Sequence, residues 1–263
     1  MGLKWFKAAE EESEGEDARH LLGRGLPMPG RFQLLLELPP VPWDVQLQHS
    51  WSDRDCSPNM RVPGGLTARR LPVPDSTDCL RGRVGCHRGL HVWRVSWPVG
   101  QRGSHAAVGV GTSRARLQAP GYRTLLGGED GESWAWGLVD NRLYHAGKAL
   151  HSYPDVSVGP FPVPESVVVI LDSDEGTLSF MVDGRYLGVA FQGLKDKTLY
   201  PMVSCVWGNC GISLTYINHL PGQPLTLTDL CRCHIRRILG EHRISEVDSL
   251  PLPQMLKNYI QES

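Results

Sequence analysis

The stretch "LDSDEGTLSFMVDGRYLGVAF" (171–191) constrains the fold of this chain more than any other. Two turn dipeptides, Glu175-Gly176 and Asp183-Gly184, separate three apolar runs that are rich in β-prone residues. Such dipeptides between apolar runs are typical of hairpins, because their backbones readily adopt the angles of a tight turn. The stretch therefore predicts an antiparallel meander of three strands.

The same pattern extends from about residue 45 to residue 218. Further β-rich runs, bounded by Gly, Pro, Asp or Asn, lie at 89–97, 105–112, 132–139, 166–172 and 211–217. In "HVWRVSW" (91–97), the two tryptophans and Val95 alternate with Val92, Arg94 and Ser96, which predicts a strand buried mainly on one face. Short strands with turns every 8–12 residues or so predict an antiparallel sandwich, and the lack of alternating long helices disfavours a doubly wound fold.

The two ends of the chain differ from this middle part. Residues 1–30 form an acidic segment that is expected to be disordered, since 7–20 hold almost nothing to bury. The ordered chain is expected to begin in "RFQLLLELPP" (31–40) with a short helical turn or an extended segment, which the two prolines end. The sandwich then covers 31–221 and a helical region covers 222–263. About 40 residues cannot bury enough apolar area to be stable alone, so this region must dock on the sandwich or on another protein.

Composition limits the possible partners and the compartment. The formal net charge of −1 creates no field that would attract nucleic acid or a membrane surface, so neither partner is expected. The longest apolar run, at 165–172, is far shorter than the ~20 residues of a membrane span. Seven cysteines at irregular spacing and no Asn-x-Ser/Thr acceptor favour a reducing compartment, so a cytoplasmic location is expected.

Motifs of enzymes are not found in the sequence. "GVGVGT" lacks the third glycine of a dinucleotide site, and there is no Walker loop, Gly-x-Ser-x-Gly or His-Glu-x-x-His. The carboxylates of "DSDE" (172–175) lie at a predicted turn, where they are common turn formers. No catalytic residue and no cofactor is therefore predicted.

The C-terminal stretch "LTLTDLCRCHIRRILG" (225–240) holds Cys231, Cys233 and His234, which suggests a metal or redox site. On a helix the two cysteines point about 200° apart and cannot both face one ion, so no metal site is predicted. A better interpretation is a helix over 226–239 with a capping box at Thr226 and Asp229 and a stop at Gly240. Its apolar stripe consists of Leu227, Leu230, Cys231, Ile235, Ile238 and Leu239, and Arg232, Arg236 and Arg237 lie on the other side. This stripe packs either on the chain's own sandwich or on a partner.

Two consecutive segments of the tail resemble the SOCS box. "TLTDLCRCHI" is similar to its elongin-binding box, and the resemblance implies that Leu227, Cys231 and Ile235 contact elongin. "LPLPQMLKNYI" (250–260) is similar to the cullin box that follows it. There the resemblance implies cullin contacts for Leu250, Pro251, Leu252, Pro253, Leu256 and Tyr259.

The preceding domain resembles the SPRY fold, and the whole of 31–263 resembles the SPRY domain-containing SOCS box family. The matching segments include "RGLHVW", "GESWAW", "LDSDEGTLSF" and "YLGVAFQGLK". The resemblance implies a mainly β protein, an antiparallel SPRY-type sandwich with a small α-helical SOCS box. It also implies a non-catalytic adaptor of a cullin-5 RING ubiquitin ligase: the SOCS box holds elongin B/C, cullin-5 and its RING subunit. The SPRY loops would hold Asp-(Ile/Leu)-Asn-Asn peptides of targets such as inducible nitric oxide synthase, leading to ubiquitination and proteasomal degradation.

The resemblance also implies the residues of the peptide site. These are Arg70, Pro72, Pro74, Ser104, Tyr122, Leu125, Val206, Trp207 and Gly208. Arg70 is expected to take an acidic side chain of the peptide, and the two aromatic residues offer amphipathic contact area. From the residues alone, however, Trp207 is expected in the core together with Trp93, Trp97, Trp134 and Trp136.

The first loop of the site departs from the family pattern. The family usually has Pro-Val-Ala-Gln-Ser-Thr-Asp, whereas "PVPDSTD" places Pro74 and Asp75 at the Ala and Gln positions. Proline removes a backbone donor, and aspartate adds a negative charge beside an acidic ligand. Two alternatives therefore remain: the sandwich binds a different epitope, or the protein is a scaffold that does not promote degradation.

Overall fold

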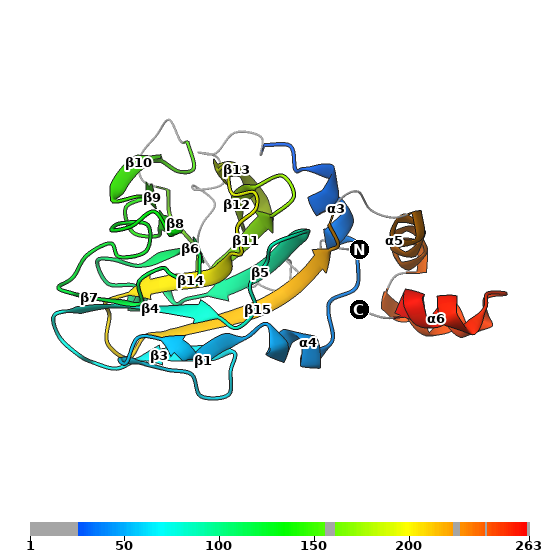
Figure 1. Cartoon of the computed structure of the whole chain (residues 1–263), viewed down its shortest axis with the longest axis horizontal. Helices are drawn as coiled ribbons and strands as arrows, with labels where there is room; N and C mark the ends of the chain where they lie inside the picture. The colour runs from blue at the N-terminus through cyan, green and yellow to red at the C-terminus, as the bar shows by residue number, and fades with distance from the viewer. Residues whose placement is uncertain (1–25, 156–160, 223–226, 240, 262–263) are drawn as a thin grey trace.

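The computed structural model describes residues 26–155, 161–222, 227–239 and 241–261 (Figure 1). Two antiparallel sheets pack face to face, as the strand pattern predicts. The first sheet has the order β1 (Trp51–Cys56), β4 (Ser76–Gly82), β14 (Tyr200–Cys205), β6 (Ala107–Gly111), β8 (Ser133–Gly137), β9 (Arg142–His145) and β10 (Lys148–Ser152), with β7 (Gln118–Pro120) paired to β4. The second has the order β13 (Arg185–Phe191), β12 (Thr177–Val182), β11 (Ser166–Asp172), β5 (Leu90–Ser96), β15 (Gly211–Leu220), β3 (Thr67–Arg70) and β2 (Met60–Arg61).

The predicted meander is confirmed as β11–β12–β13, paired antiparallel. Its first turn has Gly176 at φ +69°, and its second has Asp183 at +47° and Gly184 at +72°. The two consecutive positive φ values of the second turn match the right-handed twist of hairpin strands, which explains the Asp-Gly dipeptide there, and the positive φ in the first turn is taken by glycine.

Two apolar layers cover the two faces of the second sheet. The larger one lies between the sheets and contains Trp93 and Trp136, both at most 1% exposed. The smaller one lies under α3 (Gly30–Leu36), where Phe32 and Leu35 cover the outer face of β5 and β11. Burial of one such side chain contributes about 1.5–3 kcal/mol.

The covering helix corrects one prediction about β5. Val95 faces the core between the sheets, as the alternation indicates, but Val92 on the opposite face is also fully buried. The strand is therefore buried on both faces where α3 lies over it. The helix itself confirms the helical turn expected within 31–40, and Pro39 and Pro40 follow its end.

The C-terminal region contains α5 (Leu227–Leu239), the 3₁₀ helix η2 (Glu241–Ser249) and α6 (Gln254–Gln261). They lie at the end of the sandwich next to α3, near α4 (Trp43–Gln48), while the loop beside β7 lies at the opposite end (Figure 1). The predicted cap residue Thr226, the predicted stop Gly240 and residues 1–25 of the acidic segment lie outside the described residues. Among the described residues, no helix is long and apolar enough to cross a membrane.

Candidate functional site: a loop surface and an exposed helix

Four loops meet at the end of the sandwich away from α5. The first loop (71–75) follows β3, and the second follows the short 3₁₀ helix η1 (Val99–Gln101). The third loop (121–123) follows β7, and the fourth (206–210) follows β14. A methyl group added at Gly208 would lie 2.8 Å from the Cα of Pro72, and one added at Gly103 would lie 3.2 Å from the ring of Trp207. Because these two glycines let neighbouring loops touch directly, the loops form one continuous surface.

The 71–75 loop is held from beneath by Arg70. Its guanidinium donates to the carboxylate of Asp78 at 2.7 Å and to the backbone oxygens of Leu71, Val73 and Ser76. Asp78 is fully buried and also accepts hydrogen bonds from Ser57, Asn59, Ser76 and Gln118. A buried ion pair is stabilising when its remaining hydrogen-bonding capacity is satisfied in this way, so the loop is rigidly placed.

Two of the predicted site residues therefore lie below the surface. The Arg70 side chain is 1% exposed, and its guanidinium is paired with Asp78 beneath the loop. Contrary to the expectation, it therefore does not face an acidic ligand at the surface. Leu125 is 2% exposed and packs with Cys79 and Met202 in an apolar cluster behind the loops. Sequence reasoning missed this because an arginine at the end of a strand with inward hydrogen bonds is indistinguishable in sequence from one that faces solvent.

Two large aromatic side chains are exposed on the loop surface. Tyr122 is 53% exposed and Trp207 is 50% exposed. The Tyr122 hydroxyl accepts a hydrogen bond from the backbone N–H of Asp75 at 3.1 Å, which fixes its position. Exposed aromatics on rigid loops offer amphipathic contact area at little entropic cost, which is typical of a protein-binding surface.

Most of the other predicted residues lie on or at the rim of this surface. Pro72, Pro74 and Ser104 are exposed and Gly208 is partly exposed, whereas Val206 is buried, with 8% exposure. The exposure of Trp207 overturns the residue-only expectation of a core side chain, whereas the other four tryptophans under discussion are buried as expected. The physical reason is that β14 ends at Cys205, two residues before Trp207, so the indole is not held on the inner face of the sheet.

One supporting residue of the loop surface was not identified from the sequence. Gln101 accepts a hydrogen bond from the backbone N–H of Gly211 at 2.8 Å through its Oε1. It thereby ties η1 to the base of the 206–210 loop, across 110 positions in the chain. No local sequence pattern indicates such a long-range contact.

Burial shifts the pKa values of two cysteines and two histidines of the sandwich. Burial raises the pKa values of the Cys79 and Cys86 thiols to about 12, which makes both thiols poor nucleophiles. Burial also lowers the pKa values of His49 and His91 to about 4, far from the loops. Among the residues that the structure describes, no three His, Cys, Asp or Glu side chains could together hold a metal ion.

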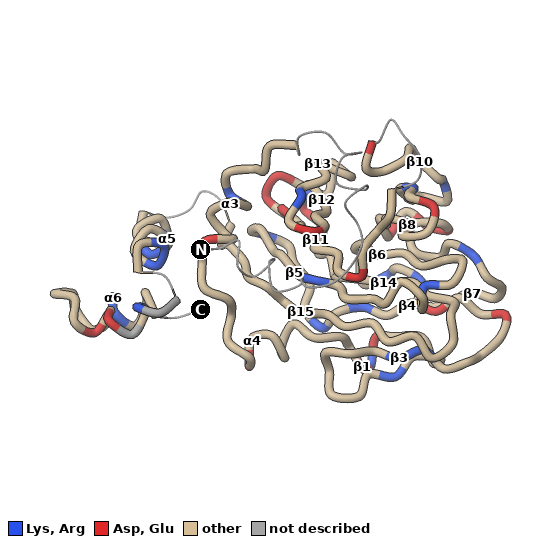
Figure 2. The backbone as a smooth tube through the Cα atoms, turned by 180° about the vertical axis from the view of Figure 1, so that it is seen from behind, with Lys and Arg blue, Asp and Glu red and all other residues tan. Residues whose placement is uncertain are grey.

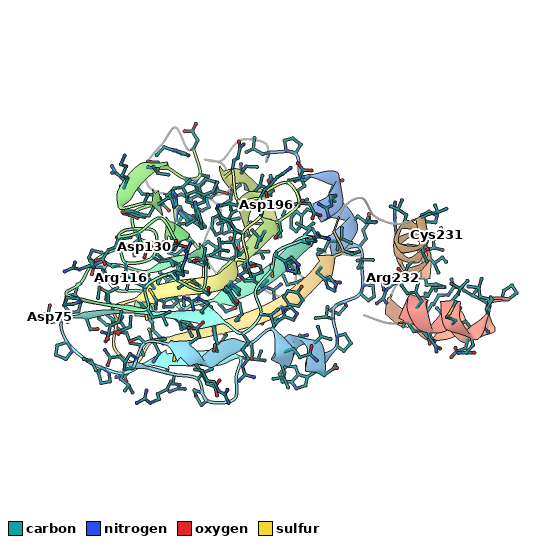
Figure 3. All side chains as sticks on the ribbon, viewed as in Figure 1. Asp75, Arg116, Asp130, Asp196, Cys231 and Arg232 are labelled. Carbon is teal, nitrogen blue, oxygen red and sulfur yellow. The ribbon has the colours of Figure 1, made fainter. Side chains whose placement is uncertain are left out.

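Helix α5 presents its apolar stripe outward. Leu227 is 77% exposed, Leu230 is 46% exposed and Ile238 is 66% exposed, and Ile235 is partly buried. Cys231 is also exposed (Figure 3). A helix that packed on its own domain would bury this face.

The arginines of α5, whose positions are blue in Figure 2, make polar contacts with the protein's own chain instead. Arg237 pairs with Glu37 just after α3 at 2.7 Å, and Arg236 donates to the backbone oxygen of Ile260 at 2.8 Å. The Arg232 guanidinium lies 4.8 Å from the ring centroid of Tyr259. The helix is thus anchored by polar contacts, and its apolar side remains available.

The 250–260 segment forms a turn and then α6. Its backbone turns through hydrogen bonds from Leu252 to Leu250 and from Leu256 to Pro253. Leu250, Leu252, Leu256 and Tyr259 are partly buried, and Pro251 and Pro253 are exposed. Val247 on η2 and Ile260 on α6 are buried, both at most 3% exposed.

Comparison with known proteins agrees with both halves of the structure. The SPRY domain family matches residues 90–217, and the SOCS box family matches residues 223–261. The chain is 53% identical to human SPRY domain-containing SOCS box protein 1 over 239 residues, which cover 88% of this chain and 87% of that protein. It is 48% identical to protein gustavus of Drosophila melanogaster (88% and 85% covered) and 44% identical to rat SPRY domain-containing SOCS box protein 2 (94% and 96% covered). The chain therefore belongs to the SPRY domain-containing SOCS box protein family, whose combination of domains is that of a substrate-receptor adaptor of cullin–RING ubiquitin ligases.

Proposed function

We propose that this protein is the substrate receptor of a cullin-5 RING ubiquitin ligase. The SOCS box would bind elongin B/C and cullin-5 with its RING subunit, and the SPRY loops would bind Asp-(Ile/Leu)-Asn-Asn segments of target proteins such as inducible nitric oxide synthase. The ubiquitin-transfer chemistry would belong to the partner subunits, and the target would be degraded by the proteasome in the cytoplasm.

The observation that carries this proposal is the outward apolar face of α5. Leu227, Leu230 and Ile238 expose large aliphatic side chains in a row, although the helix has a sandwich beside it on which to bury them. Exposed apolar stripes of this kind mark protein–protein interfaces. Leu227, Cys231 and Ile235 are the proposed elongin contacts within this face.

The cullin contacts are proposed for the 250–260 segment. The exposed or partly exposed side chains of Leu250, Pro251, Leu252, Pro253, Leu256 and Tyr259 follow α5 and η2 directly. A Pro-rich turn followed by a short helix offers a rigid apolar edge at low entropic cost.

The peptide site is proposed on the loop surface at the other end of the sandwich. Tyr122 and Trp207 would form its apolar contacts, with Pro72, Pro74, Val206 and Gly208 between them and Ser104 at the rim. The amides of the asparagines would bond with loop backbone groups. Arg70 and Leu125 would support the site from beneath.

The positions of the two surfaces support an adaptor. Asp75 on the peptide-site loop and Cys231 on α5 lie at opposite ends of the molecule (Figure 3). A protein with this arrangement can hold a target and a ligase assembly at the same time without steric conflict.

A pull-down with quantitative mass spectrometry tests the proposal. The full chain, expressed in cells, should recover elongin B/C, cullin-5 and a RING subunit, and a chain that ends at residue 221 should lose them but keep its targets. Recovery of a different cullin would refute the cullin-5 assignment. Equal recovery by the truncated chain would refute the role of the SOCS box.

A second candidate function, a scaffold that binds a different epitope, is favoured by one observation. Pro74 and Asp75 are both exposed at the tip of the peptide-site loop, where they can change which peptide fits. Calorimetry with an Asp-Ile-Asn-Asn peptide, together with target half-lives in cells with the full or the truncated chain, separates this function from the first. Unchanged half-lives with intact target binding would favour the scaffold.

A further inference from the structure

The tip of the β3–β4 loop holds an aspartate in a fixed backbone conformation. Asp75 has φ +52°, a left-handed conformation that few residues other than glycine, Asn and Asp adopt readily. Its N–H donates to the Tyr122 hydroxyl at 3.1 Å, and its carbonyl oxygen accepts from the N–H of Gly121 at 2.9 Å. Both backbone groups are used within the protein, and the exposed side chain projects beside an exposed tyrosine.

The carboxylate of Asp75 forms no ion pair with the arginine next to it. A methyl group added at Gly121 would lie 3.8 Å from Asp75 Oδ1 and 3.3 Å from Arg123 Nη2, so both groups flank this glycine. Arg123, however, pairs with Glu129 at 3.0 Å, and Glu129 also pairs with Arg116. Within the described part of the chain, Asp75 forms no ion pair at 4.0 Å or less.

We propose that Asp75 is a specificity-determining residue, which makes the loop surface select peptides with a lysine or arginine next to the segment that docks on Tyr122. This inference rests on the proposed peptide site and defines the selected peptides more narrowly. They would contain the Asp-(Ile/Leu)-Asn-Asn core, with its acidic and amide side chains, and a basic residue beside it. An acidic neighbour is selected against by the same carboxylate.

The physical basis is the pairing of a fixed negative charge with an exposed aromatic face. A lysine or arginine that crosses the Tyr122 ring gains a cation–π contact with the ring and an ion pair with Asp75. A glutamate at the same place meets an unpaired like charge. Because Asp75 is exposed, the effect is that of a surface pair, about fivefold in affinity, and it weakens as salt increases.

The substitution Asp75→Asn isolates the charge. Asparagine keeps the size of the side chain and tolerates positive φ, so the hydrogen bonds to Tyr122 and Gly121 are preserved. Asp196→Asn is a matched control, because Asp196 is also exposed and has φ +61° but lies away from the peptide-site loop (Figure 3).

The experiment is selection of a random peptide library, displayed on phage, against the full chain and the two variants. The wild type and Asp196→Asn should enrich Lys or Arg at one position beside the consensus, and Asp75→Asn should lose this enrichment. Two synthetic peptides of that consensus, with Lys or Glu at the position, should then differ about fivefold in Kd for the wild type and less than about twofold for Asp75→Asn.

Two results would overturn the inference: no basic enrichment with the wild type, or the same enrichment with Asp75→Asn. The proposed function is tested by a different part of the result, namely whether the selected consensus contains Asp-(Ile/Leu)-Asn-Asn. A consensus without Asp-(Ile/Leu)-Asn-Asn but with a basic neighbour that depends on Asp75 would refute the peptide motif and keep the role of Asp75. If no peptide is selected on the wild type, both are wrong.

Discussion

The backbone N–H of Asp75 donates a hydrogen bond to the hydroxyl of Tyr122 at 3.1 Å, which joins two loops that are 47 positions apart in the chain. The bond holds an exposed aromatic ring against the tip of the neighbouring loop, so the loop surface is arranged before any partner arrives. Preorganisation of this kind reduces the entropic cost of binding.

Substitutions can separate the hydrogen bond of the Tyr122 hydroxyl from the contact area of its ring. Tyr122→Phe removes only the hydrogen bond and is expected to weaken binding of an Asp-Ile-Asn-Asn peptide by about fivefold, the effect of one such bond. Tyr122→Ala also removes the contact area and should weaken binding more than about 30-fold. Isothermal titration calorimetry measures both. Equal affinity of wild type and Tyr122→Ala would exclude Tyr122 from the site.

Removal of the Arg70 side chain should destabilise the sandwich. Arg70→Met leaves Asp78 buried without its cation, and loss of one partner of a buried pair costs about 3–5 kcal/mol. The neighbouring exposed Arg69 is a matched control, and Arg69→Met should change the free energy of unfolding by less than about 0.5 kcal/mol. Urea denaturation followed by tryptophan fluorescence measures both values. Similar stability of the two variants would show that the buried pair is dispensable.

A charge on the apolar face of α5 should abolish elongin binding without loss of stability. Ile238 is 66% exposed in the isolated chain, so Ile238→Asp buries no charge until a partner covers it. The control is Val189→Asp, a similar change at a 43% exposed residue on β13. Co-expression with elongin B/C followed by size-exclusion chromatography should give a complex with the control only. A stable complex with Ile238→Asp would place the interface elsewhere.

Acid should destabilise the second sheet through its histidines. His91 lies among Tyr216, His219, His49, Asp174 and the backbone oxygen of Arg88, and burial lowers its pKa to about 4. The unfolded chain binds the proton near pH 6.5, so stability is fully present above pH 6.5 and falls as the pH is lowered toward 4.

His91→Gln should therefore flatten this pH dependence. The loss of Tm between pH 7.5 and pH 5 should be smaller in His91→Gln than in the wild type, and the exposed His151→Gln should behave as the wild type does. Scanning calorimetry at several pH values gives the comparison. An identical slope for His91→Gln and wild type would assign the acid sensitivity to other groups.

The fold could be predicted from local patterns, because turn residues and strand alternation depend on residues that are adjacent in the sequence. The acid–glycine turns of 175–176 and 183–184 and the alternation in 91–97 depend on neighbours, and the structure confirms the strands that they predict. The burial of Val92 could not be predicted in this way, because it depends on α3, which lies about 60 positions away in the chain.

The residues of the candidate site were predicted from the family resemblance and not from local patterns. Without the family resemblance, Trp207 is expected in the core, and only its place after the end of β14 exposes it. The inward direction of the Arg70 guanidinium also depends on tertiary contacts, since its main partner Asp78 lies on β4 and is surrounded by residues from three other segments.

The sequence by itself determined that the chain forms an antiparallel sandwich with an amphipathic helix near its C-terminus, because turn residues and hydrophobic periodicity act over a few positions. Which side of that helix faces outward was decided only by the tertiary structure. The ion pair of Arg237 with Glu37 and the contact of Arg232 with Tyr259 turn the basic side toward the chain and leave Leu227 and Ile238 exposed. The amphipathic pattern indicates only that the apolar face of the helix must be covered. The arrangement of the neighbouring elements leaves this face outside the chain's own contacts, so the cover has to come from another protein.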